Sequence, residues 1–207
     1  MKQVTGATNS QSKHTDVSIQ LRLDGHSFSM ESLSGRISGG KGKKTIEVIS
    51  AKTILVPREL FDPQSADYLL ELSGMALSGS ETVIYSDPKS QAIALMGVEE
   101  NAIRQLEKTL PGAPVWSSPL LHTPTVSTPA IWLFRYEELV YLKIWGPDRA
   151  LRLAEVLPAP TPEDTLFYIT EFVRDMNLSD YPILTGKSAA DDAHLLKKYF
   201  KRVTLCE

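Results

Sequence analysis

One short stretch carries residue types that bind phosphate in nucleotide-binding proteins. YPILTGKSA (181–189) contains a Gly-Lys-Ser run, which ends a P-loop whose backbone N–H groups and lysine hold phosphates. A P-loop also requires a glycine separated from the Gly-Lys pair by four residues, and Tyr181 stands there. Residues 181–184 have the apolar character of a strand, so YPILTGKSA is more typical of a strand that leads into a helix.

GRISGGKG (35–42) matches the glycine and lysine spacing of a P-loop more closely. Its last residue, Gly42, replaces the hydroxyl that would bind Mg²⁺. After two lysines, TIEVIS (45–50) is typical of a strand, so no helix N-terminus would face a phosphate. We interpret the stretch as a hairpin tip. The alternative is a small anion-binding patch formed by the lysines at 41, 43 and 44.

Other reactive residues are few and scattered. Asp24 and His26 are close enough for acid-base chemistry, but Asp24-Gly25 is also a dipeptide that favours a tight hairpin turn. The spacing supports no Ser/His/Asp arrangement. The four histidines and the single cysteine, Cys206, lack the spacing of zinc ligands, so we expect no metal site.

Composition narrows the class of protein. The chain has 207 residues, 42% of them hydrophobic and 23% charged, as is usual for a globular protein with a core. Its net charge of −3 argues against general binding to nucleic acid or membrane surfaces. The start lacks the apolar region of a secretory signal, no apolar run is long enough for membrane insertion, and one cysteine suits a reducing compartment. We therefore expect a cytoplasmic chain with a polar tail at 1–15.

Two regions of the chain repeat one order of elements. In the first, strands at 17–23, 26–33 and 45–57 form a meander, and two helices alternate with short strands up to Val115-Trp116. In the second, strands at 130–136, 139–145 and 150–158 precede a helix capped by Thr161, the strand 181–186, a helix opened by Ser188 and a last strand at 202–206. Each region reads βββ-α-β-α-β, with an additional hairpin strand in the first.

The division between the two regions falls in a segment without periodicity. SSPLLHTPTVSTP is rich in Pro, Ser and Thr. We therefore predict a first domain at 16–118, a linker at 119–129 and a second domain at 130–207. The tryptophans at 116, 132 and 145 are expected in the core or between the domains. The alternative is that Tyr136, Tyr141 and Trp145 mark a partner site on an exposed sheet face.

This order resembles the ribonuclease-H-like unit, and two units in tandem resemble the superfamily of actin, sugar kinases and Hsp70. DVSIQLRLDGHSFSM, AKTILVPRELFD and YPILTGKSA are more specifically similar to a small bacterial family of uncharacterised proteins with an actin-like ATPase fold. The resemblance implies an α/β fold of two ribonuclease-H-like domains with mixed sheets, here without large insertions.

In catalytic members of that superfamily, ATP lies between the domains. The resemblance implies that two hairpin turns hold the phosphates, and that a Thr-Gly-Gly-like turn packs against adenosine. Asp24 and Gly25 match the first turn, but His26 stands where a glycine is expected. The second turn, Glu137-Glu138, has no glycine. The third has Thr185 and Gly186, with Lys187 in place of the second glycine.

These departures predict a fold without efficient ATP hydrolysis. We expect a non-catalytic binding or scaffold module that binds a protein partner through the interdomain cleft or an exposed sheet, and that requires no cofactor. The alternative is a weak nucleotide-binding protein or phosphotransferase. Residual ATP with Mg²⁺ would then be held by Asp24, Gly25, Thr185, Gly186 and Lys187.

Overall fold

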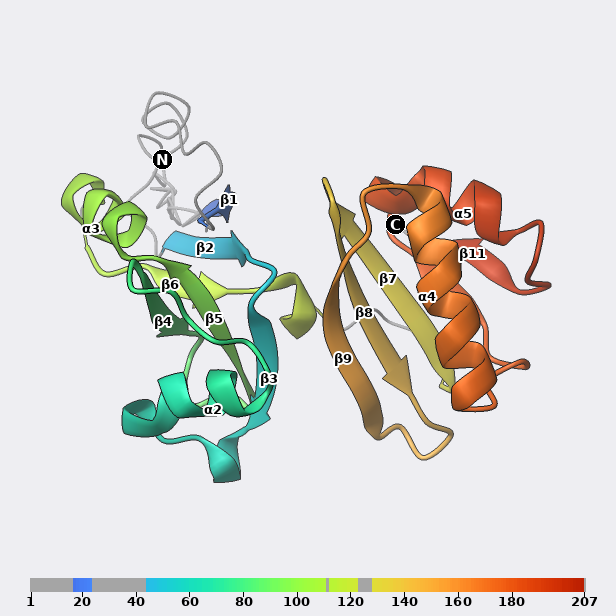
Figure 1. The fold of residues 1–207 in the computed structure, drawn as a ribbon, viewed down its shortest axis with the longest axis horizontal. Helices are drawn as coiled ribbons and strands as arrows, with labels where there is room; N and C mark the ends of the chain where they lie inside the picture. The colour runs from blue at the N-terminus through green and yellow to red at the C-terminus, as the bar shows by residue number, and fades with distance from the viewer. Residues whose placement is uncertain (1–16, 24–43, 111, 123–127, 207) are drawn as a thin grey trace, which may run out of the picture.

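The computed structural model describes residues 17–23, 44–110, 112–122 and 128–206. Figure 1 shows two bodies side by side, which we call the N-terminal half (described residues 17–122) and the C-terminal half (128–206). None of the helices in this described part has the length and apolar character that a membrane crossing requires.

The C-terminal half is one mixed sheet with two helices on the face away from the N-terminal half (Figure 1). Its strand order is β11-β10-β7-β8-β9; β7, β8 and β9 are antiparallel neighbours, whereas β10 and β11 run parallel to β7. This is the predicted ribonuclease-H-like unit. The elements are β7 (Ala130–Tyr136), β8 (Leu139–Trp145), β9 (Leu151–Pro158), α4 (Pro162–Asp175), β10 (Ile183–Thr185), η4 (Lys187–Ala189), α5 (Ala190–Leu196) and β11 (Val203–Leu205).

Of the two residues predicted to cap helices in the C-terminal half, one does so and the other does not. The predicted cap at Thr161 is confirmed and forms a capping box: the Thr161 hydroxyl accepts the Asp164 N–H, and the Asp164 carboxylate accepts the Thr161 N–H. The predicted cap at Ser188 is wrong: α5 begins at Ala190, and the Ser188 hydroxyl accepts the N–H of Arg135 instead (3.3 Å). The Ser188 side chain therefore fastens this turn to β7.

The N-terminal half consists of two small sheets. One has the order β1-β2-β6 with parallel pairs, and the other has the order β3-β5-β4 with antiparallel pairs. The elements are β1 (Val17–Arg22), β2 (Lys44–Ile49), β3 (Thr53–Pro57), η1 (Arg58–Leu60), η2 (Pro63–Ser65), α2 (Ala66–Leu72), β4 (Glu81–Tyr85), β5 (Ala92–Glu99), α3 (Glu100–Thr109), β6 (Val115–Ser117) and η3 (Pro119–Leu121).

A sharp bend joins these two sheets. The Ser50 hydroxyl donates to the Gly97 carbonyl (2.6 Å) and accepts the Lys52 N–H (3.1 Å), and Gly97 N–H donates to the Lys52 carbonyl (2.8 Å). A Cβ on Gly97 would lie 2.9 Å from the Leu77 side chain and 3.0 Å from Lys52 Cβ. Glycine at 97 therefore lets the bend approach β5 closely.

The bend and the pairing of β1 correct two predictions. The single strand predicted at 45–57 is two strands, β2 and β3, in different sheets. The predicted meander is also wrong, because β1 pairs directly with β2 and runs parallel to it. The strand predicted at 26–33 lies outside the described residues. Alternation of apolar and polar side chains indicates a strand, but it does not indicate which strand pairs with it or whether the pair is parallel. The sequence pattern therefore did not distinguish a meander from the parallel pairing of β1 with β2.

Candidate functional site

The two halves share an apolar core at their junction. It combines Ile49 and Leu120 of the N-terminal half with Trp132, Tyr141 and Trp145 of the C-terminal half, all buried. The Tyr141 hydroxyl accepts the backbone N–H of Ser50 at the bend (3.0 Å). The expectation that these two tryptophans pack between the halves is confirmed, so Tyr141 and Trp145 do not mark an exposed sheet face.

Polar residues cross the same junction. His122 Nε2 lies 2.5 Å from the buried Glu47 carboxylate, and the Lys143 ammonium donates to the His122 carbonyl (2.6 Å). Lys143 Nζ also lies 5.8 and 5.3 Å from the ring centroids of Trp132 and Trp145. Burial lowers the pKa of Lys143 to about 8. Because only 3% of this lysine is exposed, its amine is closed off from any substrate.

An arginine occupies the place where the second hairpin turn meets the turn after β10. The Arg135 guanidinium donates to both carboxylate oxygens of Asp192 (2.6 Å each) and to the Thr165 hydroxyl (2.7 Å). It also donates to the carbonyls of Glu137 (2.9 Å) and Ala159 (2.5 Å). The guanidinium is therefore fully engaged within the protein, with no free fork for an anion.

The second hairpin turn is also tied to the N-terminal half. Glu137 has a φ of 49°, and its carboxylate accepts from the Arg22 guanidinium at 2.8 Å. Glu138 is exposed beside it. The carboxylates at this turn oppose the approach of a phosphate.

The residues predicted to contact adenosine lie together at the end of β10. Thr185 is fully buried, and its carbonyl accepts the Cys206 N–H (2.7 Å). The Gly186 N–H donates to the Leu133 carbonyl (2.9 Å), with a φ of −68° that any residue adopts. Lys187 is exposed. Asp24 and Gly25 lie outside the described residues, as do the lysines at 41 and 43.

No sequence pattern indicated the pairing of Arg135 with Asp192. They stand 57 positions apart, and no local motif connects them. Within the described ranges no group of three or more His, Cys, Asp or Glu side chains is arranged to hold a metal ion. The side chains at the junction thus bond to one another and join the two halves.

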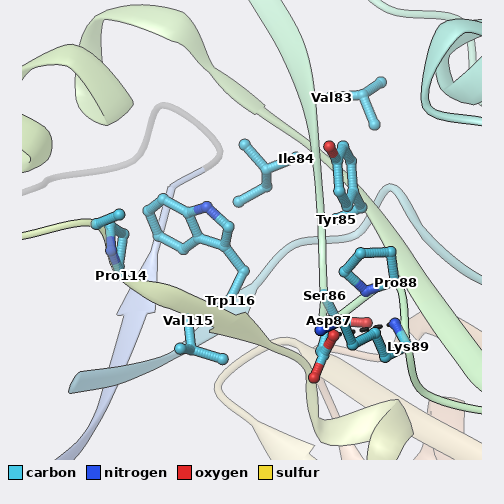
Figure 2. A pocket seen from close by; sticks show the side chains of 11 residues that line it. Val83, Ile84, Tyr85, Ser86, Asp87, Pro88, Lys89, Pro114, Val115 and Trp116 are labelled. Carbon is cyan, nitrogen blue, oxygen red and sulfur yellow. Dashed lines mark hydrogen bonds between the residues drawn. The ribbon is translucent and has the colours of Figure 1, made fainter. Parts of the chain in front are cut away.

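A pocket of about 560 Å³ opens in the N-terminal half between β4 and β6 (Figure 2). Figure 2 shows Trp116 of β6 directed toward Ile84, whereas Val83 and Tyr85 lie on the opposite side of β4. Asp87 and Lys89 stand at one end, and the Asp87 carboxylate accepts the Lys89 backbone N–H (3.0 Å). The lining is mostly apolar with few charges, as in sites that bind ligands or peptide segments.

A second groove, of about 570 Å³, lies between the halves. It is lined by β3, by α2 and by residues 154–156 of β9. Leu60 and Leu72 stand at this groove with 69% of each residue exposed. Neither this groove nor the β4–β6 pocket is lined by Thr185, Gly186 or Lys187.

Comparisons with known proteins bear on the fold. A scan with protein-family models gave no match, and neither did a sequence search of curated proteins. Among solved structures, the chain is similar to a Bacteroides thetaiotaomicron protein described as having an actin-like ATPase fold and unknown function. The TM-score is 0.64 at 15% identity, over 82% of this chain and 70% of the other.

A second solved structure is more distant. It is the cytoplasmic domain of EpsL, an inner-membrane component of the type II secretion system of Vibrio cholerae. The TM-score is 0.45 at 10% identity, over 92% of this chain and 85% of that domain. The first similarity confirms the expected fold class and the predicted resemblance to uncharacterised proteins of that fold.

Proposed function

We propose that this chain, which has the actin-like ATPase fold, is a non-catalytic binding or scaffold module of the cytoplasm. It would bind a protein partner through the β4–β6 pocket or the groove beside β9, rather than a nucleotide at the turns between its halves. The observation that carries the proposal is the engagement of Arg135 by Asp192 and its neighbours at the second hairpin turn.

Phosphate binding at such turns depends on free N–H donors and cations. The Gly186 N–H is already bonded to the Leu133 carbonyl, and Arg22 faces Glu137. If a phosphate drew Arg135 away, the Asp192 carboxylate, with 1% of its side chain exposed, would remain buried without its cation. Leaving one partner of a buried ion pair uncompensated costs about 3–5 kcal/mol. This cost disfavours nucleotide binding at the turn.

The two grooves described above are more suitable surfaces for binding a protein partner than the turns between the halves. Both the β4–β6 pocket and the groove beside β9 are lined mainly by apolar side chains, and each has a volume in the range that accommodates a partner's side chains. Fold alone does not assign a function. The proposal therefore relies on these surfaces and on the occupied turn.

The alternative, weak nucleotide binding through Asp24, Gly25, Thr185, Gly186 and Lys187, makes a different prediction in a thermal-shift experiment. We expect ATP or ADP with Mg²⁺ to leave the melting temperature where Mg²⁺ alone leaves it, and ATP to remain unhydrolysed. Lys187→Ala and the matched surface variant Lys201→Ala are then indistinguishable. An increase of several degrees with ATP that Lys187→Ala removes and Lys201→Ala retains would overturn the proposal.

A further inference from the structure

The hydrogen-bonding groups of β4 alternate between β5 and the pocket. Ser86 N–H donates to the Ala94 carbonyl, and Glu100 N–H donates to the Ser80 carbonyl, each at 3.0 Å. In an antiparallel pair the residues that face the neighbouring strand occur at every second position. Positions 80, 82, 84 and 86 therefore bond to β5. Val83 and Tyr85 point their N–H and C=O groups away from it.

The neighbour on β5 supports this alternation. Gly97 stands directly opposite Val83, and its N–H donates to Lys52 on the far side of β5. β4 is the last strand of its sheet, and no strand among the described residues pairs with its outer edge. An unpaired edge of this kind is a template for another strand.

The β4–β6 pocket runs along this edge. Ile84 packs in one apolar core while Val83 and Tyr85 pack in another, yet all three line the pocket. A hollow lined by consecutive residues from both faces of a strand must follow the strand's edge. Across the pocket, β6 is the last strand of the other sheet, and Trp116 faces Ile84 (Figure 2).

One charged group at the end of the pocket is available to a partner. The Asp87 carboxylate is oriented into the turn by the Lys89 N–H. The exposed Lys89 ammonium has no partner among the described residues. An acidic side chain would complement this cation.

We propose that the β4–β6 pocket binds an extended segment of a partner protein, which adds to β4 as a strand. Its backbone bonds to Val83 and Tyr85, its alternate apolar side chains enter the space beside Trp116, and an acidic residue pairs with Lys89. This proposal rests on the proposed binding function and names the kind of partner. Strand addition takes its affinity from main-chain bonds and its specificity from alternate side-chain pockets.

A display library of random linear heptamers, selected on the full chain, provides the probe. Enriched peptides are expected to alternate apolar and polar residues and to contain an acid. Their affinity is measured by anisotropy for two variants of similar side-chain size. Val83→Thr keeps the outward N–H and is the reference against which the loss of that N–H is measured. Val83→Pro removes that N–H and binds about tenfold more weakly, because it loses one hydrogen bond and places a ring at the edge.

Val83→Pro is compatible with the fold because an edge strand tolerates proline where its N–H faces outward. Lys89→Glu tests the charged contact, and peptides with an acid should bind it about threefold more weakly, as for an exposed ion pair. If Val83→Pro does not fold, hydrogen exchange of the backbone amides is measured in the native chain with and without peptide, and this measurement tests strand addition. Peptide must slow exchange at Val83 and Tyr85, and unchanged exchange there overturns the proposal.

The two proposals fail in different ways. Peptides that bind Val83→Pro as tightly as the native chain, or a library that yields no enriched peptide, would overturn strand addition at β4. Neither result affects the proposed non-catalytic function, which is lost only if ATP raises the melting temperature.

Discussion

The buried ammonium of Lys143 should make stability depend on pH above neutrality. Burial lowers its pKa from 10.5 to about 8, so the folded chain releases this proton at a lower pH than the unfolded chain does. Between these values the unfolded chain binds more protons, and the free energy of unfolding therefore rises with pH. The full difference between the pKa of Lys143 in the unfolded and in the folded chain corresponds to about 3 kcal/mol of unfolding free energy. We expect roughly 2 kcal/mol of it to appear between about pH 7.5 and pH 10.

Urea unfolding, followed by tryptophan fluorescence at a series of pH values, measures this effect. The quantity of interest is the free energy of unfolding of the native chain minus that of Lys143→Met. The variant leaves the His122 carbonyl without the Lys143 donor. That loss does not vary with pH, so the test is whether the difference in unfolding free energy between the native chain and Lys143→Met changes with pH.

Lys198→Met removes an exposed lysine and serves as the control. The control should follow the pH profile of the native chain, whereas Lys143→Met should lack the rise above pH 8. A constant difference between the native chain and Lys143→Met from about pH 7.5 to pH 10 would refute the argument that burial of this cation opposes folding.

Four further substitutions test individual contacts. Asp192→Ala should lower the free energy of unfolding by about 3–5 kcal/mol, because it leaves the Arg135 guanidinium, with 13% of its side chain exposed, without its anion; urea titration measures this loss. Gly97→Ala should destabilise by about 1–3 kcal/mol through overpacking. Gly186→Ala, whose Cβ would lie 3.7 Å from the nearest atom, should change the free energy of unfolding by less than about 0.5 kcal/mol. Glu155→Gln should raise stability at neutral pH, because burial raises the pKa of Glu155 and stability falls as pH rises through that value.

The C-terminal half was predictable because its signals are local. The strands at 130–136 and 139–145 match β7 and β8, and the turn at Glu137-Glu138 joins them. Thr161 and Asp164 form the capping box that their spacing indicates. Such features depend on neighbours within a few residues, and the chain needs no distant partner to form them.

The N-terminal half was less predictable because its sheets depend on distant partners. β4 is one of the short strands expected before Val115-Trp116, but its position at the edge of a sheet follows from the pairing of β5 with both β3 and β4. The outward N–H groups of Val83 and Tyr85 follow from that pairing. Periodicity describes which side chains are buried and does not describe which backbone edge stays open.

By itself, the sequence determined the class of fold, the elements of the C-terminal half and the departures from the nucleotide-binding motifs. The tertiary structure alone decided that Arg135 meets Asp192, that the junction closes around Lys143, and that β4 presents a free edge beside Trp116. The physical reason is the range of the interactions. Caps, turns and alternation act between residues close in the chain, whereas ion pairs, cores and sheet edges join residues that only the folded chain brings together.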